Sequence, residues 1–487
     1  MNLLSNAMNK YSSIPLPMKA SIVFVFASLI TQGLSIITLP IFTRIMDPSD
    51  IGVVTLYNSW EMLIGIVAGL ALGSGSFNIG MMEFKEERDE YIASILNLSS
   101  LSAFVLFVFY FIFHEQIQPF IGFSSELIYL MFLGFILAPA MNFWMLKQRY
   151  EYKYKAVALV TVMTAVLSSI LAVLAVLFVN DFVEGSYPLG DIRVFATKAI
   201  PFIVGAVLYA SFIFRSKVFM KKKYLVFAIT LSLPLLVHTL AKQLLDVSDR
   251  IMIERLQGLT EVGIYGVLYT LSALSLIVWN AINASLVPFM FKKLELGLDN
   301  AAKINAVVKP LITFYFVFCI FLILVAPEVV QILATKEYYD AIYLMPPIAA
   351  GIFFTSLYNV FSNVLLFYKK TKLIMIATLI AVVVNIGLNF IFIPIFGFVA
   401  AAYTTLLSYL ILAGLQYIFM KKILSGAPLF DDKYLWMIAL LMIVLALVLN
   451  ITYEFNILRY FIIVAIVVGA VVKRKSIIKG FLRAKDR

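Results

Sequence analysis

Long apolar runs recur along the whole chain, and they constrain its fold more than any other feature. A helix needs about 20 apolar residues to cross a bilayer, where the backbone must satisfy its own hydrogen bonds. Of the 487 residues 63% are hydrophobic and 13% are charged, about half the charged share of a soluble domain. The sequence therefore predicts an all-α polytopic membrane protein with fourteen transmembrane helices. We place them near residues 18–43, 51–78, 91–113, 125–146, 156–179, 194–214, 224–246, 262–290, 307–333, 341–368, 373–395, 397–420, 434–452 and 456–472.

The basic residues are distributed unevenly between the connections, which predicts the orientation of the chain. With the N-terminus inside, 30 of the 38 Lys and Arg residues lie in inner segments and seven in outer ones, while Lys242 lies within a span. Because cytoplasmic loops of membrane proteins are enriched in Lys and Arg, both termini are predicted to be cytoplasmic. The net charge of +11 therefore reflects topology, and no nucleic-acid partner is expected.

The chain also contains an internal repeat. An arginine followed by an acidic-aliphatic-glycine triplet occurs at residues 44–52, after the first span, and again at 255–263, after the seventh. Six spans separate the copies, so the two halves enter from the same side and should be related by an axis along the membrane normal. We expect pseudo-symmetric six-helix bundles at 1–215 and 216–425, followed by helices 13–14 and a basic cytoplasmic tail at 426–487.

The seventh span carries ionisable residues at helical spacing. His238, Lys242, Asp246 and Asp249 follow one another at intervals of four, four and three residues, so they share one helical face. Ionisable groups inside a membrane are costly, and they normally face a cavity or one another. We interpret residues 233–265 as one wall of a substrate cavity.

The first span carries a polar stripe in the same register. At the repeat offset of 211 residues, Thr31 aligns with Lys242 and Gln32 aligns with Gln243. The stripe consists of Ser28, Thr31, Gln32, Ser35 and Thr38. Close helix packing is the alternative role for Ser and Thr at such spacing. The shared register favours a second, neutral wall of the same cavity.

Glu61 lies within the second span, roughly 16 Å from its outer end at 1.5 Å per residue. A carboxylate at that depth needs a partner or a proton. Lys242 lies at a comparable depth, so we expect the two to pair across the cavity. A protonated or locally paired structural glutamate is the alternative.

Two other groups of polar residues are assigned structural roles. Four intramembrane asparagines, Asn280, Asn283, Asn385 and Asn389, are expected to form interhelical hydrogen bonds. The acidic run 83–90 is expected to be a solvated loop.

Several chemistries are excluded by what the chain lacks. Cys319 is its one cysteine, and His114 and His238 are its two histidines, so no disulfide framework and no thiol or histidine metal cluster can form. The glycine-rich run 73–80 lacks the Lys-Ser/Thr of a phosphate-binding loop. The connections are too short to build a catalytic domain. No enzyme activity, metal or cofactor is expected, apart from coupling to Na+ or H+.

Four stretches of the chain resemble a known family; they are residues 41–52, 248–265, 326–339 and 385–397. They are similar to the polysaccharide and lipid-linked oligosaccharide flippases of the multidrug/oligosaccharidyl-lipid/polysaccharide exporter superfamily. The resemblance implies two bundles in a V shape and alternating access. It implies movement of an undecaprenyl-diphosphate-linked glycan, such as an O-antigen or capsule repeat unit, from the inner to the outer leaflet of a bacterial or archaeal cytoplasmic membrane. A polysaccharide polymerase and glycosyltransferases are the implied protein partners.

The leading hypothesis is a flippase for such a lipid-linked oligosaccharide. A diphosphate does not cross hydrocarbon unless a cationic group in a hydrated cavity holds it. Lys242 is the best candidate, with Arg250 and Arg255 guiding the headgroup near the exit. The family's cavities are typically more cationic than this one. The predicted substrate-binding residues are Lys242, Arg250, Arg255, Gln243, Gln32, Thr31 and Arg44.

Two alternatives remain, one within the same superfamily and one from another class. In an ion-coupled multidrug or small-molecule antiporter of the same superfamily, Glu61 or Asp246 would carry the proton or Na+. Asp249 and His238 complete the predicted ion-coupling or gating set. A membrane enzyme, such as a glycan polymerase or ligase, would usually carry a long outer loop with catalytic groups, and the chain has none.

The fourteen-span topology can be tested by cysteine labelling in intact cells. Labels at 217–222 and 475–485 should be protected as cytoplasmic, and labels at 184–190 and 336–340 should react from outside. Because one missed span inverts every later connection, a single site on the wrong side contradicts the topology.

Overall fold

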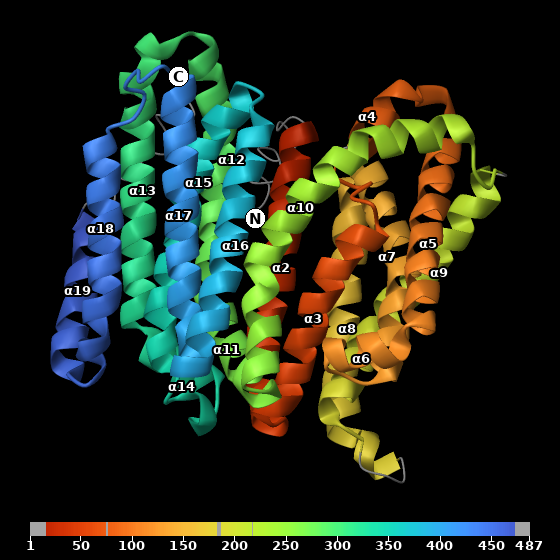
Figure 1. Ribbon diagram of the computed structural model, residues 1–487, viewed down its shortest axis with the longest axis horizontal. Helices are drawn as coiled ribbons and strands as arrows, with labels where there is room; N and C mark the ends of the chain where they lie inside the picture. The colour runs from red at the N-terminus through yellow and green to blue at the C-terminus, as the bar shows by residue number, and fades with distance from the viewer. Residues whose placement is uncertain (1–15, 75, 183–186, 217, 473–487) are drawn as a thin grey trace, which may run out of the picture. The chain divides into compact units, whose positions relative to one another are not determined.

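The computed structural model describes residues 16–74, 76–182, 187–216 and 218–472, and Figure 1 shows their course. The described residues form helices joined by short turns and contain no strand. Within them, thirteen helical segments are long and apolar enough to cross a membrane, and a shorter apolar helix spans Asn456–Gly469. The predicted all-α polytopic fold is therefore confirmed, with the shorter helix at the position of the fourteenth predicted span.

The chain divides into two compact units, Met1–Gln243 and Leu244–Arg487. The division falls within the long helix α10 (Lys222–Leu256), which contributes its first part to one unit and its last part to the other. The repeat boundaries expected from the sequence, at 215 and 425, concern an ancestral duplication and remain a prediction.

The N-terminal unit holds the helices that precede α10. They are α2 (Leu16–Ile45), α3 (Pro48–Ala68), α4 (Ser76–Glu83), η1 (Lys85–Glu87), α5 (Arg88–Ile112), α6 (His114–Ile121), α7 (Ser125–Tyr150), α8 (Tyr154–Phe182) and α9 (Leu189–Ser216). Helix α8 packs against α2 and α9, and α7 packs against α5 and α9. Helix α4 also packs against α5, and Gly80 is needed for this contact, because a Cβ there would lie 2.2 Å from the buried ring of Tyr91.

The C-terminal unit holds the helices that follow α10. They are α11 (Leu259–Ser272), α12 (Leu274–Glu295), η2 (Leu298–Asn300), α13 (Ala301–Leu324), α14 (Ala326–Leu333), η3 (Lys336–Tyr338), η4 (Ile342–Leu344), α15 (Met345–Phe367), α16 (Thr371–Phe396), α17 (Val399–Ile423), α18 (Asp432–Val448), η5 (Leu449–Tyr453) and α19 (Asn456–Val472).

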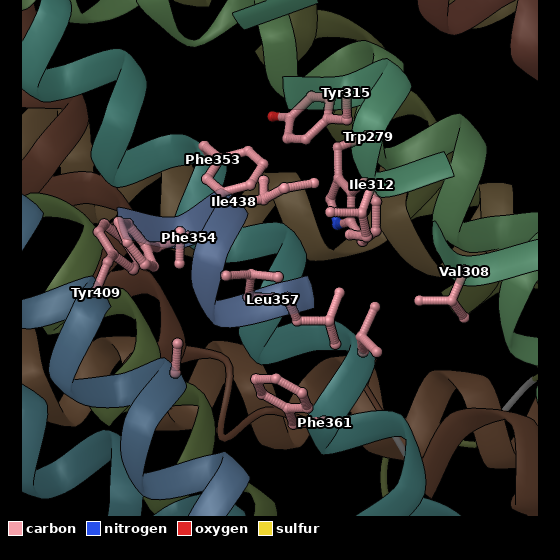
Figure 2. Close-up of a cluster of buried hydrophobic side chains, with 14 of the residues drawn as sticks. Trp279, Val308, Ile312, Tyr315, Phe353, Phe354, Leu357, Phe361, Tyr409 and Ile438 are labelled. Atoms are coloured by element: carbon pink, nitrogen blue, oxygen red, sulfur yellow. The ribbon is translucent and has the colours of Figure 1, made fainter. Parts of the chain in front are cut away.

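Helix α15 lies at the centre of the C-terminal unit and packs against α12, α13, α17 and α18. Figure 2 shows part of the resulting core, in which Trp279, Tyr315 and Phe353 come together from three helices. Lipid is as apolar as these side chains, so their contribution comes from close packing rather than from escape from water.

The acidic run 83–90 was predicted to be a solvated loop; much of it is exposed, but it is helical, covering the end of α4, η1 and the start of α5. Three of its carboxylates form ion pairs, which are Asp89–Lys147, Glu90–Lys221 and Glu87–Lys223. The hydroxyl of Tyr224 also lies 2.8 Å from a Glu87 oxygen and 3.0 Å from a Glu90 oxygen. The run therefore anchors the first turn of α10 to α5 within the N-terminal unit.

The predicted bounds of the second and ninth spans were also wrong, and the eighth span is interrupted within its predicted bounds. The second span was expected to reach residue 78, but α3 ends at Ala68. The eighth is two helices, α11 and α12, that meet at Ala273. The ninth was expected to reach 333, but α13 ends at Leu324 and α14 begins two residues later. Pro327 favours this break, because proline suits the first turn of a helix and lacks the N–H that an interior position needs.

Candidate functional site

Helix α10 carries the predicted charged stripe, and its four ionisable groups all fall within the helix. In the N-terminal unit, the side chain of Lys242 is exposed, and it forms no hydrogen bond or ion pair with any residue that the structure describes. Two buried nitrogens beside it, Nδ1 of His238 and Nε2 of Gln243, also lack a partner within the described ranges. This part of α10 therefore presents three polar groups that the protein leaves unsatisfied.

In the C-terminal unit, the stripe continues into groups that the protein itself satisfies. Asp249 is buried, and its carboxylate accepts a hydrogen bond of 2.5 Å from the Tyr265 hydroxyl. The other carboxylate oxygen lies 3.4 Å from the Arg250 guanidinium. Asp246 accepts a hydrogen bond of 2.7 Å from the Tyr409 hydroxyl. These carboxylates therefore have internal partners.

Arg250 was expected at the outer end of the seventh span, but α10 continues past it to Leu256. Its guanidinium donates a hydrogen bond of 2.6 Å to the carbonyl of Asp246 and lies 4.1 Å from the centre of the Tyr269 ring. A cation over an aromatic face is stabilised by the ring quadrupole. To contact a headgroup, Arg250 would have to leave these partners.

The remaining predicted substrate-binding residues lie at or near helix surfaces. Arg44 is exposed and donates a hydrogen bond of 2.6 Å to the carbonyl of Pro40. Arg255 lies 3.6 Å from the carboxylate of Glu254. Gln32 is exposed, while the hydroxyl of Thr31 donates to the carbonyl of Ser28 at 3.0 Å. Such back-bonding satisfies a hydroxyl within its own helix and leaves its acceptor capacity open.

Glu61 is paired with Lys198, and the expected pairing with Lys242 is wrong for this structure. The Nζ atom of Lys198 on α9 lies 2.5 Å from Oε2 of Glu61 on α3, and the two helices pack together within the N-terminal unit. The locally paired glutamate, which was the alternative interpretation, is the one observed. Lys198 lies nine residues inside α9, at a depth that suits a partner for the Glu61 carboxylate.

The Glu61 side chain also lines a cavity of about 490 Å³ in the N-terminal unit, formed by residues of α3, α5, α7 and α10. This cavity was not predicted. The feature of the sequence that could have indicated it is the glycine-rich segment that follows α3. That segment was interpreted only by its lack of a phosphate-binding motif.

The intramembrane asparagines form the expected interhelical hydrogen bonds at three of four positions. Asn363 donates to Asn283 at 3.0 Å, linking α15 to α12. Ser248 on α10 donates to Asn385 on α16 at 2.9 Å. Asn389 accepts a hydrogen bond from the Thr404 hydroxyl on α17. The described residues contain no group of three or more His, Cys, Asp or Glu side chains that could hold a metal ion.

Three family models match parts of the chain. The model described as polysaccharide biosynthesis protein matches residues 18–294, which is more than half of the sequence. The MatE model matches residues 234–391, and the model described as Lipid II flippase MurJ matches residues 339–471. No curated protein sequence matches the chain significantly.

Solved structures share the fold at low sequence identity. The Lipid II flippase MurJ in an inward closed conformation gives a TM-score of 0.66 at 17% identity, over 94% of this chain and 100% of that one. An inward-facing multidrug resistance MATE family transporter gives 0.58 at 15% identity, over 83% and 98%. The Vibrio cholerae MATE transporter VcmN in its bent form gives 0.52 at 12% identity, over 85% and 98%. At these identities the likeness establishes the fold alone.

The Glu61–Lys198 pair can be tested by exchanging its charges. Glu61→Lys or Lys198→Glu alone should lower the free energy of unfolding by roughly 2 kcal/mol, the value of a hydrogen bond to a charged group. The double exchange should recover most of that loss, measured by thermal unfolding of the purified protein.

Glu61→Lys combined with Lys242→Glu is the matched control, and it should recover nothing. If the Glu61–Lys198 exchange is no more stable than its worse single variant, the two groups do not stabilise one another.

Proposed function

The chain belongs to the polysaccharide biosynthesis protein family, and we propose that within it the chain is a flippase for a lipid-linked oligosaccharide. Its substrate would be an undecaprenyl-diphosphate-linked repeat unit of a cell-surface polysaccharide. It would move this lipid from the inner to the outer leaflet of a bacterial or archaeal cytoplasmic membrane by alternating access. A polymerase and glycosyltransferases would act with it.

The state of Lys242 carries this proposal. An ammonium group within a membrane helix is costly unless water, a counter-ion or a substrate accompanies it. Lys242 is exposed and has no ion-pair partner among the described residues, unlike Lys198. A diphosphate would supply the missing negative charge through charge-assisted hydrogen bonds. The unsatisfied nitrogens of His238 and Gln243 would supply further donors to its oxygens.

The other predicted residues have supporting roles in this proposal. Gln32 and Thr31 would contribute neutral hydrogen-bonding groups from α2, and the exposed Arg44 and Arg255 would attract the headgroup at the outer end. Arg250 and Asp249 would act as a gating pair, because each must leave an internal partner before it contacts anything else.

Ion-coupled antiport is the second candidate function, and one observation favours it. Glu61 faces a cavity and is held by a lysine, so a proton or Na+ that neutralised its carboxylate would release Lys198. In the flippase proposal the same event would couple an ion gradient to transport. Asp246 would be a second coupling site, since its carboxylate accepts a hydrogen bond from the Tyr409 hydroxyl that a cation could displace.

Replacing Lys242 tests the proposed function. Lys242→Ala should lower export of the surface glycan by roughly tenfold or more, the effect of losing a hydrogen bond to a charged group, while protein levels in the membrane stay normal. Lys242→Arg should retain part of the export, because the charge remains and only its geometry changes. Surface glycan is measured by lectin or antibody binding in a strain that depends on this protein.

Lys222→Ala is the matched control, since Lys222 is an exposed lysine in the first turn of the same helix. It should export normally. Normal export by the Lys242→Ala variant would remove Lys242 from the mechanism.

A further inference from the structure

The cavity of the N-terminal unit has the size and lining of a small-molecule site. Its volume of about 490 Å³ falls within the range of roughly 300–1,000 Å³ that is usual for such sites. Most lining side chains are apolar, and a few polar groups converge on the space. They are Glu61, Ser74, Ser99, Asn142 and Thr239.

Glycines keep this space open. Gly65, Gly69 and Gly73 recur every four residues along the end of α3 and the turn that follows it, and all three line the cavity. A Cβ on Gly65 would lie 3.2 Å from the Phe135 ring, and one on Gly73 would lie 3.1 Å from the Asn142 amide nitrogen. Larger residues here would therefore press on the opposite wall, α7.

The chain ends α3 in a costly conformation beside the cavity. Leu70 and Ala71 both have φ of 50°, in the left-handed region that side chains with a Cβ seldom adopt. Backbone strain of this kind persists only where the surrounding structure enforces it. It places the turn at residues 69–74 along the cavity instead of continuing the helix through it.

One buried polar group in the cavity wall lacks a hydrogen-bond partner among the described residues. Ser99 on α5 is fully buried, and its hydroxyl makes no hydrogen bond with the residues that the structure describes. A buried hydroxyl without a partner costs roughly 1–3 kcal/mol. The next residue, Ser100, avoids this cost by donating to the carbonyl of Leu96 at 3.1 Å. The hydroxyl has no exposed surface, so a ligand in the cavity would supply the partner that Ser99 lacks only after this side chain turns toward the space.

Two further groups offer hydrogen bonds to the same space. Oε2 of Glu61 is paired with Lys198. Its other oxygen, Oε1, lies near Gly134 on the cavity wall, 3.9 Å from the position that a Cβ on Gly134 would take. The amide of Asn142 is exposed, with no hydrogen bond to the described residues. Together with Ser99 they provide both donors and acceptors.

The electrostatic balance of the cavity selects the class of ligand. A cation would have to displace Lys198 before it could pair with the Glu61 carboxylate. An anion would be repelled by that carboxylate. A hydrocarbon chain would leave Ser99 and Asn142 without partners, which is unfavourable. A neutral molecule with several hydroxyl groups meets all three conditions, since it can donate to Glu61 Oε1 and bond to Ser99 and Asn142 without disturbing the ion pair.

We propose that this cavity binds the sugar attached to the diphosphate of the transported lipid. The proposal rests on the proposed function, and it makes the cavity the part of the protein that recognises the glycan. Thr239 lines the cavity and lies three residues before Lys242 on α10, so the two side chains are neighbours on one helix surface. A diphosphate held by Lys242 therefore brings its first sugar to the mouth of the cavity.

The test measures lipid binding to the full-length protein in nanodiscs. The probes are undecaprenyl diphosphate and three undecaprenyl-diphosphate-linked monosaccharides, carrying glucose, galactose or N-acetylglucosamine. The wild-type protein should bind at least one glycosylated lipid roughly tenfold more tightly than the bare lipid, the effect of one or two added hydrogen bonds.

Ser99→Ala and Asn142→Ala should each reduce this gain by roughly threefold to tenfold, with no change in affinity for the bare lipid. Ser100→Ala is the matched control and should keep the full gain, because that hydroxyl already has a partner. Ser99→Ala should unfold at the wild-type temperature or above, since a hydroxyl without a partner does not stabilise the fold.

The proposal is overturned if none of the glycosylated lipids binds more tightly than the bare lipid, or if Ser99→Ala and Asn142→Ala both keep the gain. Tight binding of tetraphenylphosphonium that Glu61→Gln abolishes would also overturn it, in favour of a site for organic cations. Failure of the proposed function looks different, because Lys242→Ala would then bind the bare lipid as well as the wild-type protein does.

Discussion

Hydrocarbon does not solvate charge, and this constraint decides how the ionisable side chains of the chain are arranged. Several of those in the described helices have partners inside their own unit. Glu61 is held by Lys198, and Asp249 is held by Tyr265 and Arg250. In each case attraction and hydrogen bonds offset a desolvation cost that neither group could bear alone. Lys242 departs from this pattern, and the proposed function follows from the departure.

The two parts of α10 differ in a way that suits a transporter. The part in the C-terminal unit is built into a network in which Asp246 and Asp249 meet tyrosines, and Ser248 meets Asn385. A fully satisfied polar network holds its members in one arrangement. The part in the N-terminal unit carries Lys242 with unsatisfied neighbours, and Thr239 of the same segment lines the cavity. Helix α10 therefore joins a hydrogen-bonded network to side chains that are available to bind a ligand.

Much of the fold could be predicted from sequence because hydrocarbon imposes strict rules. Spans of about 20 apolar residues must be helical, so the position of the membrane-spanning segments followed from hydropathy. Boundaries were less certain, since they depend on local features such as the left-handed residues after α3 and Pro327 before α14. The same uncertainty misplaced Arg250, because α10 extends ten residues beyond its predicted end at residue 246.

The candidate site was only partly predictable, because the partner of each polar side chain depends on how the helices pack against one another. Helical spacing placed Lys242 on a face with His238. It could not show that Lys198 on another helix would form an ion pair with Glu61. Nothing in the sequence around Ser99 distinguishes it from Ser100, and only the packed helices show which hydroxyl lacks a partner. The cavity was missed for the same reason.

Transbilayer movement of a lipid-linked sugar in proteoliposomes tests the central claim most directly. The purified protein would be reconstituted with a fluorescent undecaprenyl-diphosphate-linked sugar, and the rate at which the lipid reaches the opposite leaflet would be measured. The account predicts that the wild-type protein accelerates this movement and that the Lys242→Ala protein reduces the acceleration by roughly tenfold or more. Equal rates for the two proteins would contradict it.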